Sequence, residues 1–131
     1  MDVELRPVLS DTKWRELIAS MRRLKDCGWL VQHHAKDIRG PWPSPRGWDG
    51  EWYYHLYPWK DLEWVDIKCD HREGRPFRGP VALNEEEQSA INAGIRAALK
   101  EYAIPFSVES GVVRVWGYTR PGATPQWQLA D

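Results

Sequence analysis

The stretch LEWVDIKC, residues 62–69, is the part of the sequence that decides the fold. It is predicted to form a β-strand, and apolar and polar residues alternate along it from Val65 to Cys69. Side chains two positions apart share a face, so we expect Val65 and Ile67 to face the core and Trp64 and Asp66 to face away from it. The sequence therefore predicts that this strand belongs to an antiparallel sheet with one face toward the core.

The preceding stretch EWYYHLY, residues 51–57, is predicted to be the neighbouring strand because it is rich in aromatic residues. Residues 58–61 begin with a proline and are predicted to form the turn between the two strands. This hairpin would pair Tyr57 with Leu62 and would present an aromatic face opposite the core. That face would consist of Tyr53, His55, Tyr57 and Trp64, bordered by a pair of Glu51 with Lys68.

One amphipathic helix is predicted before these strands in the sequence, and a second is predicted after them. The first has Asp11 as its N-cap and ends at Gly28, a residue type that favours the backbone conformation found just after a helix. The second begins at Asn84, where Glu87 completes a capping box, and is stopped by Pro105. Apolar residues recur at helical spacing in both helices: Trp14, Leu17, Ile18, Met21 and Leu24 in the first, and Ile91, Ile95, Ala98, Leu99 and Tyr102 in the second.

The remaining elements complete a mixed fold. Residues 29–37 are predicted to form a strand, and residues 105–109 and 112–118 to form a hairpin that turns through Ser110 and Gly111. The element order is then α-β-β-β-α-β-β. This order predicts the α+β class, with an antiparallel sheet of about five strands and two helices packed on one face, in one domain over residues 1–131.

The composition argues against several classes of protein. Of the 131 residues, 42% are hydrophobic and 28% are charged, so wholesale disorder is not expected. A net charge of −1 gives no strong overall attraction to nucleic acid or to an anionic membrane. No apolar run is long enough to span a membrane and no signal-peptide core is present, so we expect a cytoplasmic protein. Cys27 and Cys69 are too few for a disulfide framework and are interpreted as small, partly buried thiols.

Tryptophan is the unusual feature of the composition. The chain has nine tryptophans, and five of them lie between residues 42 and 64. A small core needs only a few such rings, so several are expected to lie near the surface. The proline- and glycine-rich stretch RGPWPSPRGWDG (39–50) contains Trp42 and Trp48. We expect this loop to fold back onto the domain or to bind a partner.

Three segments of the chain resemble a family of small uncharacterised bacterial proteins. They are TKWRELIASMRRL (12–24), LEWVDI (62–67) and IPFSVESGVVRVWGYTRP (104–121). The resemblance covers most of the chain, with residues 39–50 the least comparable part, and it carries no catalytic residues. Small bacterial proteins of this kind resemble immunity proteins, which bind and block a toxin enzyme, so the resemblance implies a protein partner.

Two metal-dependent functions can be weighed on the residues. A structural metal site is not expected, because the candidate ligands do not form the paired set that four-coordinate zinc requires. These candidates are His33, His34, His55, Cys69 and His71. A metal-dependent nuclease is the alternative enzyme, because Asp66 and Lys68 lie two residues apart on one face, with Asp37 or Asp49 as a further acid. In such nucleases the carboxylate holds Mg²⁺ and the lysine stabilises the attacking hydroxide.

A single-stranded nucleic-acid binder is a third alternative. Arg72, Arg75 and Arg78 follow the aromatic strands, and aromatic platforms beside basic grooves hold single strands. Acids within the same region oppose this function, because they would repel phosphate. These acids are Asp49, Glu51, Asp61, Glu63 and Asp66.

A protein interface fits the mixture of aromatic and acidic residues best. Trp, Tyr and Arg dominate the binding energy of interfaces, and acids around them would steer a basic partner. We therefore expect a non-enzymatic protein-binding module of the immunity-protein type, with no catalytic residue, cofactor or metal. The candidate partner-binding residues are Trp42, Trp48, Tyr53, His55, Tyr57, Trp59, Trp64 and Asp66.

Overall fold

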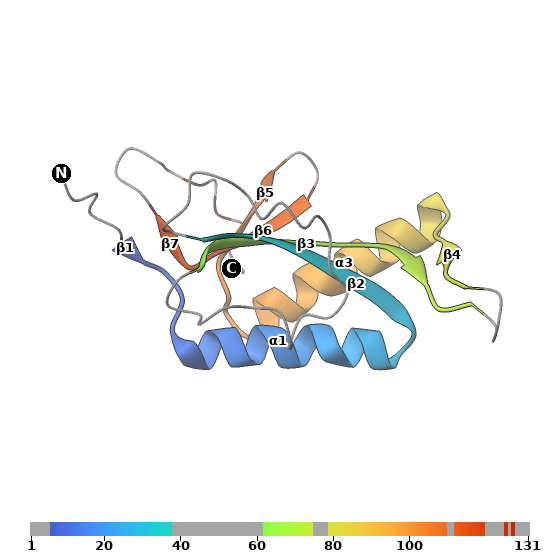
Figure 1. Ribbon diagram of the computed structural model, residues 1–131, viewed down its shortest axis with the longest axis horizontal. Helices are drawn as coiled ribbons and strands as arrows, with labels where there is room; N and C mark the ends of the chain where they lie inside the picture. The colour runs from blue at the N-terminus through green and yellow to red at the C-terminus, as the bar shows by residue number, and fades with distance from the viewer. Residues whose placement is uncertain are drawn as a thin grey trace.

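The computed structural model describes residues 6–37, 62–74, 79–109 and 112–119, together with residues 125 and 127. Within these ranges the chain forms two helices, α1 (Asp11–Asp26) and α3 (Glu85–Glu101). Its strands are β1 (Arg6–Pro7), β2 (Trp29–Asp37), β3 (Leu62–Arg72), β4 (Val81–Ala82), β5 (Phe106–Glu109), β6 (Val112–Trp116) and β7 (Tyr118–Thr119). Figure 1 shows how these elements are arranged.

Five strands form one antiparallel sheet. Four of them lie in the order β2-β3-β6-β5, and the short strand β4 pairs with the far end of β3. Both helices lie on the same side of this sheet (Figure 1). The predicted α+β class is confirmed. A separate two-stranded sheet, which was not predicted, joins β1 to β7.

The N-cap of helix α1 lies one residue earlier than the sequence predicted. The N-cap is Ser10, whose Oγ accepts a hydrogen bond from the backbone N–H of Lys13 at 3.3 Å. Asp11, predicted as the N-cap, is the first helical residue, where its charge favours the positive end of the helix dipole. At the other end Gly28 has a φ of +94°, so the prediction that glycine terminates this helix is confirmed.

Helix α3 has the predicted capping box. The backbone N–H of Glu87 donates to Asn84 Oδ1 at 2.8 Å, and the backbone N–H of Asn84 donates to Glu87 Oε1 at 3.3 Å. The helix ends at Glu101, before Pro105 is reached. Ala103 takes a φ of +52° and the Ile104 N–H bonds back to the Leu99 carbonyl at 2.8 Å. A local reversal after the last turn therefore ends the helix, and Pro105 is not its terminator.

The core fills the space between the sheet and the two helices. Trp14, which the sequence placed on the apolar stripe of α1, is only 1% exposed. Val65 and Ile67 face this core, as predicted. The buried residues around them come from both helices, from β3 itself and from three further strands: Leu17, Met21, Val31, Cys69, Ile91, Ile95, Leu99, Phe106, Val113 and Val115.

The predicted pairing of β3 with residues 51–57 is wrong, although those residues themselves lie outside the described part of the chain. β3 pairs with β2 on one edge, with His34 opposite Asp66. On its other edge it pairs with β6, with Arg114 opposite Asp66. A strand has two edges, and both are occupied at Trp64–Ile67. LEWVDIKC is thus a central strand and does not belong to a local hairpin.

The terminal hairpin is shorter than predicted because Gly117 interrupts it. β6 ends at Trp116, and the Gly117 N–H donates to the Glu63 carbonyl at 2.8 Å. A Cβ on Gly117 would lie 2.1 Å from the Leu62 carbonyl oxygen, so only glycine fits this close approach. The chain then continues as β7. No helix among the described residues is long and apolar enough to cross a membrane.

Candidate functional site

The face of the main sheet away from the helices carries the predicted candidates that the structure describes. We call this the outer face. It consists of Gln32, His34 and Lys36 on β2, Trp64, Asp66 and Lys68 on β3, Arg114 and Trp116 on β6, and Ser107 and Glu109 on β5. The strict alternation of side chains along each strand places these residues together.

Arg114 is the centre of the outer face. Its Nε donates to Asp66 Oδ1 at 2.7 Å and its Nη2 to Asp66 Oδ2 at 3.1 Å, a two-bonded geometry that fixes both groups. The guanidinium carbon also lies 3.8 Å from the ring centroid of Trp64 and 5.6 Å from that of Trp116. At these distances the cation is attracted to the ring faces. Four strand positions thus form one cluster of two Trp, one Arg and one Asp.

Burial governs the electrostatics of Asp66. This residue is only 8% exposed, and loss of water raises the pKa of its carboxyl above the usual value. The hydrogen bonds and the charge of Arg114 lower the pKa and offset only part of that rise. The ionised form of the buried Asp66 side chain is therefore stabilised by the hydrogen bonds and the charge of Arg114.

Two further ion pairs lie on or beside the outer face. Lys36 Nζ is 3.2 Å from Glu63 Oε2, where an irregularity in the pairing of β2 with β3 brings Glu63 beside Lys36. Lys68 Nζ is 3.4 Å from Asp70 Oδ2, two residues along the same strand. The sequence predicted Glu51 as the partner of Lys68, but Glu51 lies outside the described residues. Glu63 and Asp70 therefore each have a cationic partner.

A chain of hydrogen bonds joins β6 to β5 beside Arg114. The indole N–H of Trp116 donates to Ser107 Oγ at 2.9 Å, and the Ser107 hydroxyl donates to Glu109 Oε1 at 3.0 Å. Ser107 is buried, so this pairing satisfies two polar groups that have little contact with water. The chain fixes the orientation of the Trp116 ring, which supports Arg114.

Only part of the cluster reaches the surface. Trp64 is 7% exposed and Trp116 is 8% exposed, whereas 21% of the Arg114 side chain and 18% of the Lys36 side chain are exposed. His34 is also partly exposed, and its ring lies 6.0 Å from that of Trp64 in a tilted arrangement. The tryptophans are therefore packed supports, and the cationic side chains are the groups a partner could touch.

The predicted site residues are only partly described. Trp64 and Asp66 lie on the face that the sequence predicted. Their neighbours in that prediction lie outside the described residues: Trp42, Trp48, Tyr53, His55, Tyr57 and Trp59.

The side chains considered for a metal site lie apart where the structure describes them. His33 and Cys69 are buried on the helix side, His34 lies on the outer face, and His71 Nδ1 is 2.8 Å from Asp70 Oδ1. Burial raises the pKa of the Cys69 thiol. Among the described residues there is no group of three or more side chains that could hold a metal ion.

Sequence reasoning missed Arg114, Trp116 and Lys36. A signal for the first two was present, because the alternation in VVRVW (112–116) places Arg114 and Trp116 on one face. That signal gains meaning only when β6 is known to lie beside β3. Pairing between distant strands is not encoded in local periodicity, so this neighbourhood was not predicted.

The chain belongs to the DUF6678 family, a family of unknown function whose model matches residues 2–122. The resemblance to an uncharacterised family, which three segments of the sequence indicated, is confirmed to that extent. No curated protein and no solved structure matches the chain.

Proposed function

We propose that this protein is a non-enzymatic protein-binding module that acts in the bacterial cytoplasm, and that it neutralises a toxin in the manner of an immunity protein. The recognition surface in this proposal is the outer face, with His34, Lys36 and Arg114 as its accessible groups. The observation that carries the proposal is the cluster in which Arg114 is held between Trp64 and Asp66. Trp and Arg are the residue types that dominate interface energies, and a preorganised Arg loses little freedom on binding.

The arrangement of Asp66 and Lys68 favours binding over catalysis. A metal-dependent nuclease needs a carboxylate with a lone pair directed at the ion and a lysine directed at the attacking water. Both oxygens of Asp66 accept hydrogen bonds from Arg114, and Lys68 is paired with Asp70. Using these residues in catalysis would require both ion pairs to be broken, and the Asp66 pair is largely buried.

The proposal also changes the expected character of the partner. The sequence predicted an acid-bordered aromatic face and hence a basic partner. In the described part of the face Asp66 is paired with Arg114, Glu109 accepts a hydrogen bond from the Ser107 hydroxyl, and His34, Lys36 and Arg114 are partly exposed. An acidic surface is therefore the better complement, and it would meet Arg114 without displacing Asp66.

The test begins with isolation of the partner from the native cell by means of a tagged chain. The purified partner is then titrated by calorimetry with the wild type and with His34→Ala, Arg114→Lys and the control Lys100→Ala. Arg114→Lys keeps the charge but loses the two-bonded geometry and the stacking. We expect the first two variants to bind at least about tenfold more weakly, a loss of about 1.4 kcal/mol, and the α3 control to bind as the wild type does.

Two results would count against the proposal. Unchanged affinity in both outer-face variants would remove the outer face as the recognition surface. Mg²⁺-dependent cleavage of nucleic acid by the purified chain, abolished in Asp66→Asn, would show that the chain is an enzyme. The circular dichroism spectrum of each variant serves as the control for folding.

A further inference from the structure

A recess of about 260 Å³ opens between α3 and the sheet. Its position follows from a break in the pairing along one edge of β3. β6 pairs with β3 as far as Ile67, and β4 pairs with it from His71 onward. The recess lies beside β3 at the gap between these two partner strands, and its opposite wall is α3.

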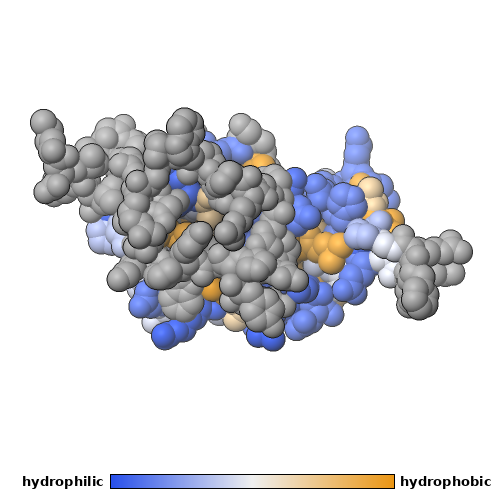
Figure 2. Space-filling view, in the orientation of Figure 1, coloured by the Kyte–Doolittle hydropathy of each residue, from blue (hydrophilic) through white to orange (hydrophobic). Residues whose placement is uncertain are grey.

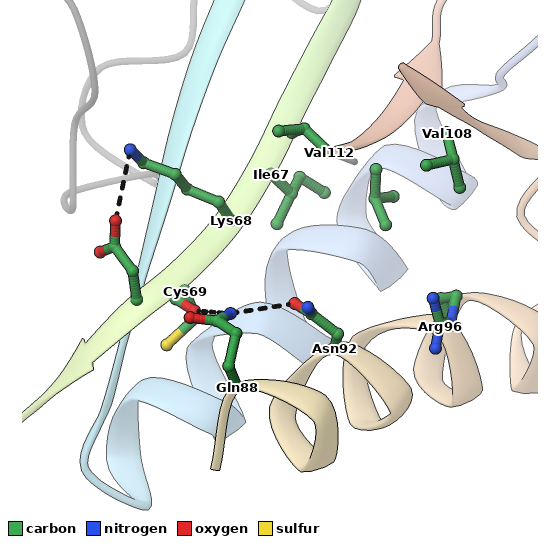
Figure 3. Close-up of a pocket in the computed structure, with 10 residues that line it drawn as sticks. Ile67, Lys68, Cys69, Gln88, Asn92, Arg96, Val108 and Val112 are labelled. Atoms are coloured by element: carbon green, nitrogen blue, oxygen red, sulfur yellow. Dashed lines mark hydrogen bonds and ion pairs between the residues drawn. The ribbon is translucent and has the colours of Figure 1, made fainter. Parts of the chain in front are cut away.

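Three polar side chains line the wall that α3 provides. Gln88, Asn92 and Arg96 lie four residues apart, a spacing that places them in one row along a helix. The apolar row of the same helix, which contains Ile91 and Ile95, is buried in the core. Figure 3 shows the polar row on the side of α3 that faces the strands across the recess.

Hydrogen bonds orient the first two of these side chains. Gln88 Nε2 donates to the Cys69 carbonyl at 2.5 Å and to Asn92 Oδ1 at 3.3 Å. Because Asn92 accepts through Oδ1, its Nδ2 group keeps its N–H donors for another partner. Neither Asn92 Nδ2 nor the Arg96 guanidinium has a hydrogen-bond or ion-pair partner among the described residues. The recess therefore offers two donor groups one helical turn apart, and one of them is charged.

The wall that the sheet provides is apolar. Ile67, Val113 and Val108 form one row across β3, β6 and β5 on the helix side of the sheet. Exposure rises along this row from 1% to 7% to 41%. Val108 and Val81 are the two exposed large hydrophobic residues among those described, and Figure 2 shows the described surface as mainly hydrophilic in that view, with small hydrophobic areas. An occupant of the recess would therefore meet apolar side chains on one wall and polar donors on the other.

The two ends of the recess differ in charge. Arg96 is exposed on α3 and lies at the end near Val108 (Figure 3). At the opposite end Asp70 has partners for both carboxylate oxygens: its Oδ2 is 3.4 Å from Lys68 Nζ and its Oδ1 is 2.8 Å from His71 Nδ1. An anionic group in the recess would therefore be attracted to the Arg96 end.

We propose that the recess binds a small monocarboxylate that carries a short apolar chain. The Arg96 guanidinium donates to both carboxylate oxygens, a geometry for which arginine is suited, and Asn92 Nδ2 donates to one of them. The apolar chain lies against Val108 and Val113. The recess is just below the roughly 300–1,000 Å³ of typical small-molecule sites, which restricts the ligand to a small one. These residues are separate from the outer face, so the proposal does not rest on the proposed function.

The test titrates the full chain with four probes at constant ionic strength and follows binding by NMR. Hexanoate carries both proposed features. Hexanol keeps the chain without the carboxylate, hexylammonium reverses the charge, and acetate lacks the chain. The methyl resonances of Val108 and Val113 report contact with the apolar wall, and the side-chain amide resonances of Asn92 report contact with the carboxylate.

We expect hexanoate to shift both sets of resonances and to bind at least about tenfold more tightly than each of the other three probes. Arg96→Gln should weaken hexanoate binding at least about tenfold, whereas Lys100→Gln, which removes a second exposed cation of α3, should bind as the wild type does. Arg96→Glu should prefer hexylammonium to hexanoate.

The apolar wall is tested by Val108→Thr, which replaces one methyl group by a hydroxyl of similar size. We expect hexanoate to bind roughly fourfold more weakly, because about one buried methyl group of contact is lost. Val81→Thr changes the other exposed valine and should bind as the wild type does. The circular dichroism spectrum of each variant confirms that it is folded.

Three results would overturn the inference. One is the absence of hexanoate-induced shifts at Val108, Val113 and Asn92. Another is equal affinity for hexanoate and hexanol, because the carboxylate would then have no partner in the recess. The third is equal weakening in Arg96→Gln and Lys100→Gln, because the net charge of the chain would then explain the effect. Arg114→Lys should bind hexanoate as the wild type does, which separates this inference from the proposed function.

Discussion

The two faces of β3 are both buried near Trp64–Ile67, but by different chemistry. On the helix side Val65 and Ile67 are at most 1% exposed and are surrounded by apolar side chains. On the outer face Trp64 and Asp66 are 7% and 8% exposed, and they meet Arg114 through stacking and two hydrogen bonds. One face is a conventional core, and the other is a polar and aromatic cluster of comparable burial.

This difference shows what the outer face requires to remain folded. Apolar packing tolerates small losses, because each contact contributes little by itself. A buried ion pair behaves differently, because removal of one member leaves the other charged without a partner. The outer face should therefore be more sensitive to single substitutions than to matched double substitutions, and the helix face should not show this pattern.

The largest expected effect is that of Arg114→Leu, which leaves Asp66 buried without its partner. We expect a loss of about 3–5 kcal/mol in the free energy of unfolding, measured by urea denaturation. The double variant Asp66→Leu/Arg114→Leu should recover most of this loss, since no charge is then left unpaired. Equal losses in the single and the double variant would show that the cluster contributes through packing alone.

Ile67→Ala on the helix face is expected to cost about 2–5 kcal/mol, because it leaves a cavity in a close-packed core. Lys68→Ala, the next residue on the same strand, is its control. The side chain of Lys68 is 30% exposed and its pair with Asp70 lies near the surface, so we expect a change of at most about 1 kcal/mol. A cost for Lys68→Ala that equals that of Ile67→Ala would contradict the assignment of the two faces.

Ser107→Ala tests the hydrogen-bond chain that orients Trp116. The substitution removes the acceptor of the buried indole N–H, and we expect a loss of about 1–3 kcal/mol in the free energy of unfolding. Ser107→Thr retains a hydroxyl and serves as the conservative control, with a smaller loss expected. Thermal denaturation of both variants measures the difference, and no loss in Ser107→Ala would mean that the hydroxyl has no such role.

Asp66 and Asp70 provide a smaller and more specific comparison along one face of the strand. Burial raises the pKa of Asp66. Partial burial also acts to raise the pKa of Asp70, but His71 and Lys68 together lower it. Carboxyl carbon resonances followed by NMR should therefore titrate above the usual value of about 3.9 for Asp66 and below it for Asp70. Midpoints in the reverse order would contradict the account of the outer face.

The two shifts have opposite consequences for stability. The stabilising contribution of Asp66 is greatest below its unfolded pKa and is lost as the pH rises through its raised folded pKa. That of Asp70 is present above its unfolded pKa and is lost as the pH falls through its lowered folded pKa. The wild type should thus gain stability relative to Asp66→Asn as the pH falls through the folded pKa of Asp66.

Local patterns in the sequence predicted the elements well where one segment determines its own structure. The capping box at Asn84, the glycine after α1 and the bounds of β2 depend on neighbouring residues, and they are confirmed. The alternation in LEWVDIKC also assigned Val65 and Ile67 to the core. These features follow from local backbone geometry and from periodicity.

Long-range pairing was the limit of the prediction. A hairpin between residues 51–57 and 62–69 was the shortest connection that the sequence offered, but β3 instead pairs with β2 and with β6, whose Arg114 lies 48 residues from Asp66. A carboxylate on an aromatic strand indicated a polar face. It did not indicate which cation would neutralise it, because that choice depends on strand order.

Photo-crosslinking is the most direct test of the central claim, which is that the outer face recognises a protein partner. Benzoylphenylalanine is placed at position 34 on the outer face or at position 100 on α3, and each tagged chain is irradiated in its native cell. We predict a single crosslinked protein from position 34 and none from position 100. A partner that copurifies with the tagged chain but crosslinks only from position 100 would contradict the claim.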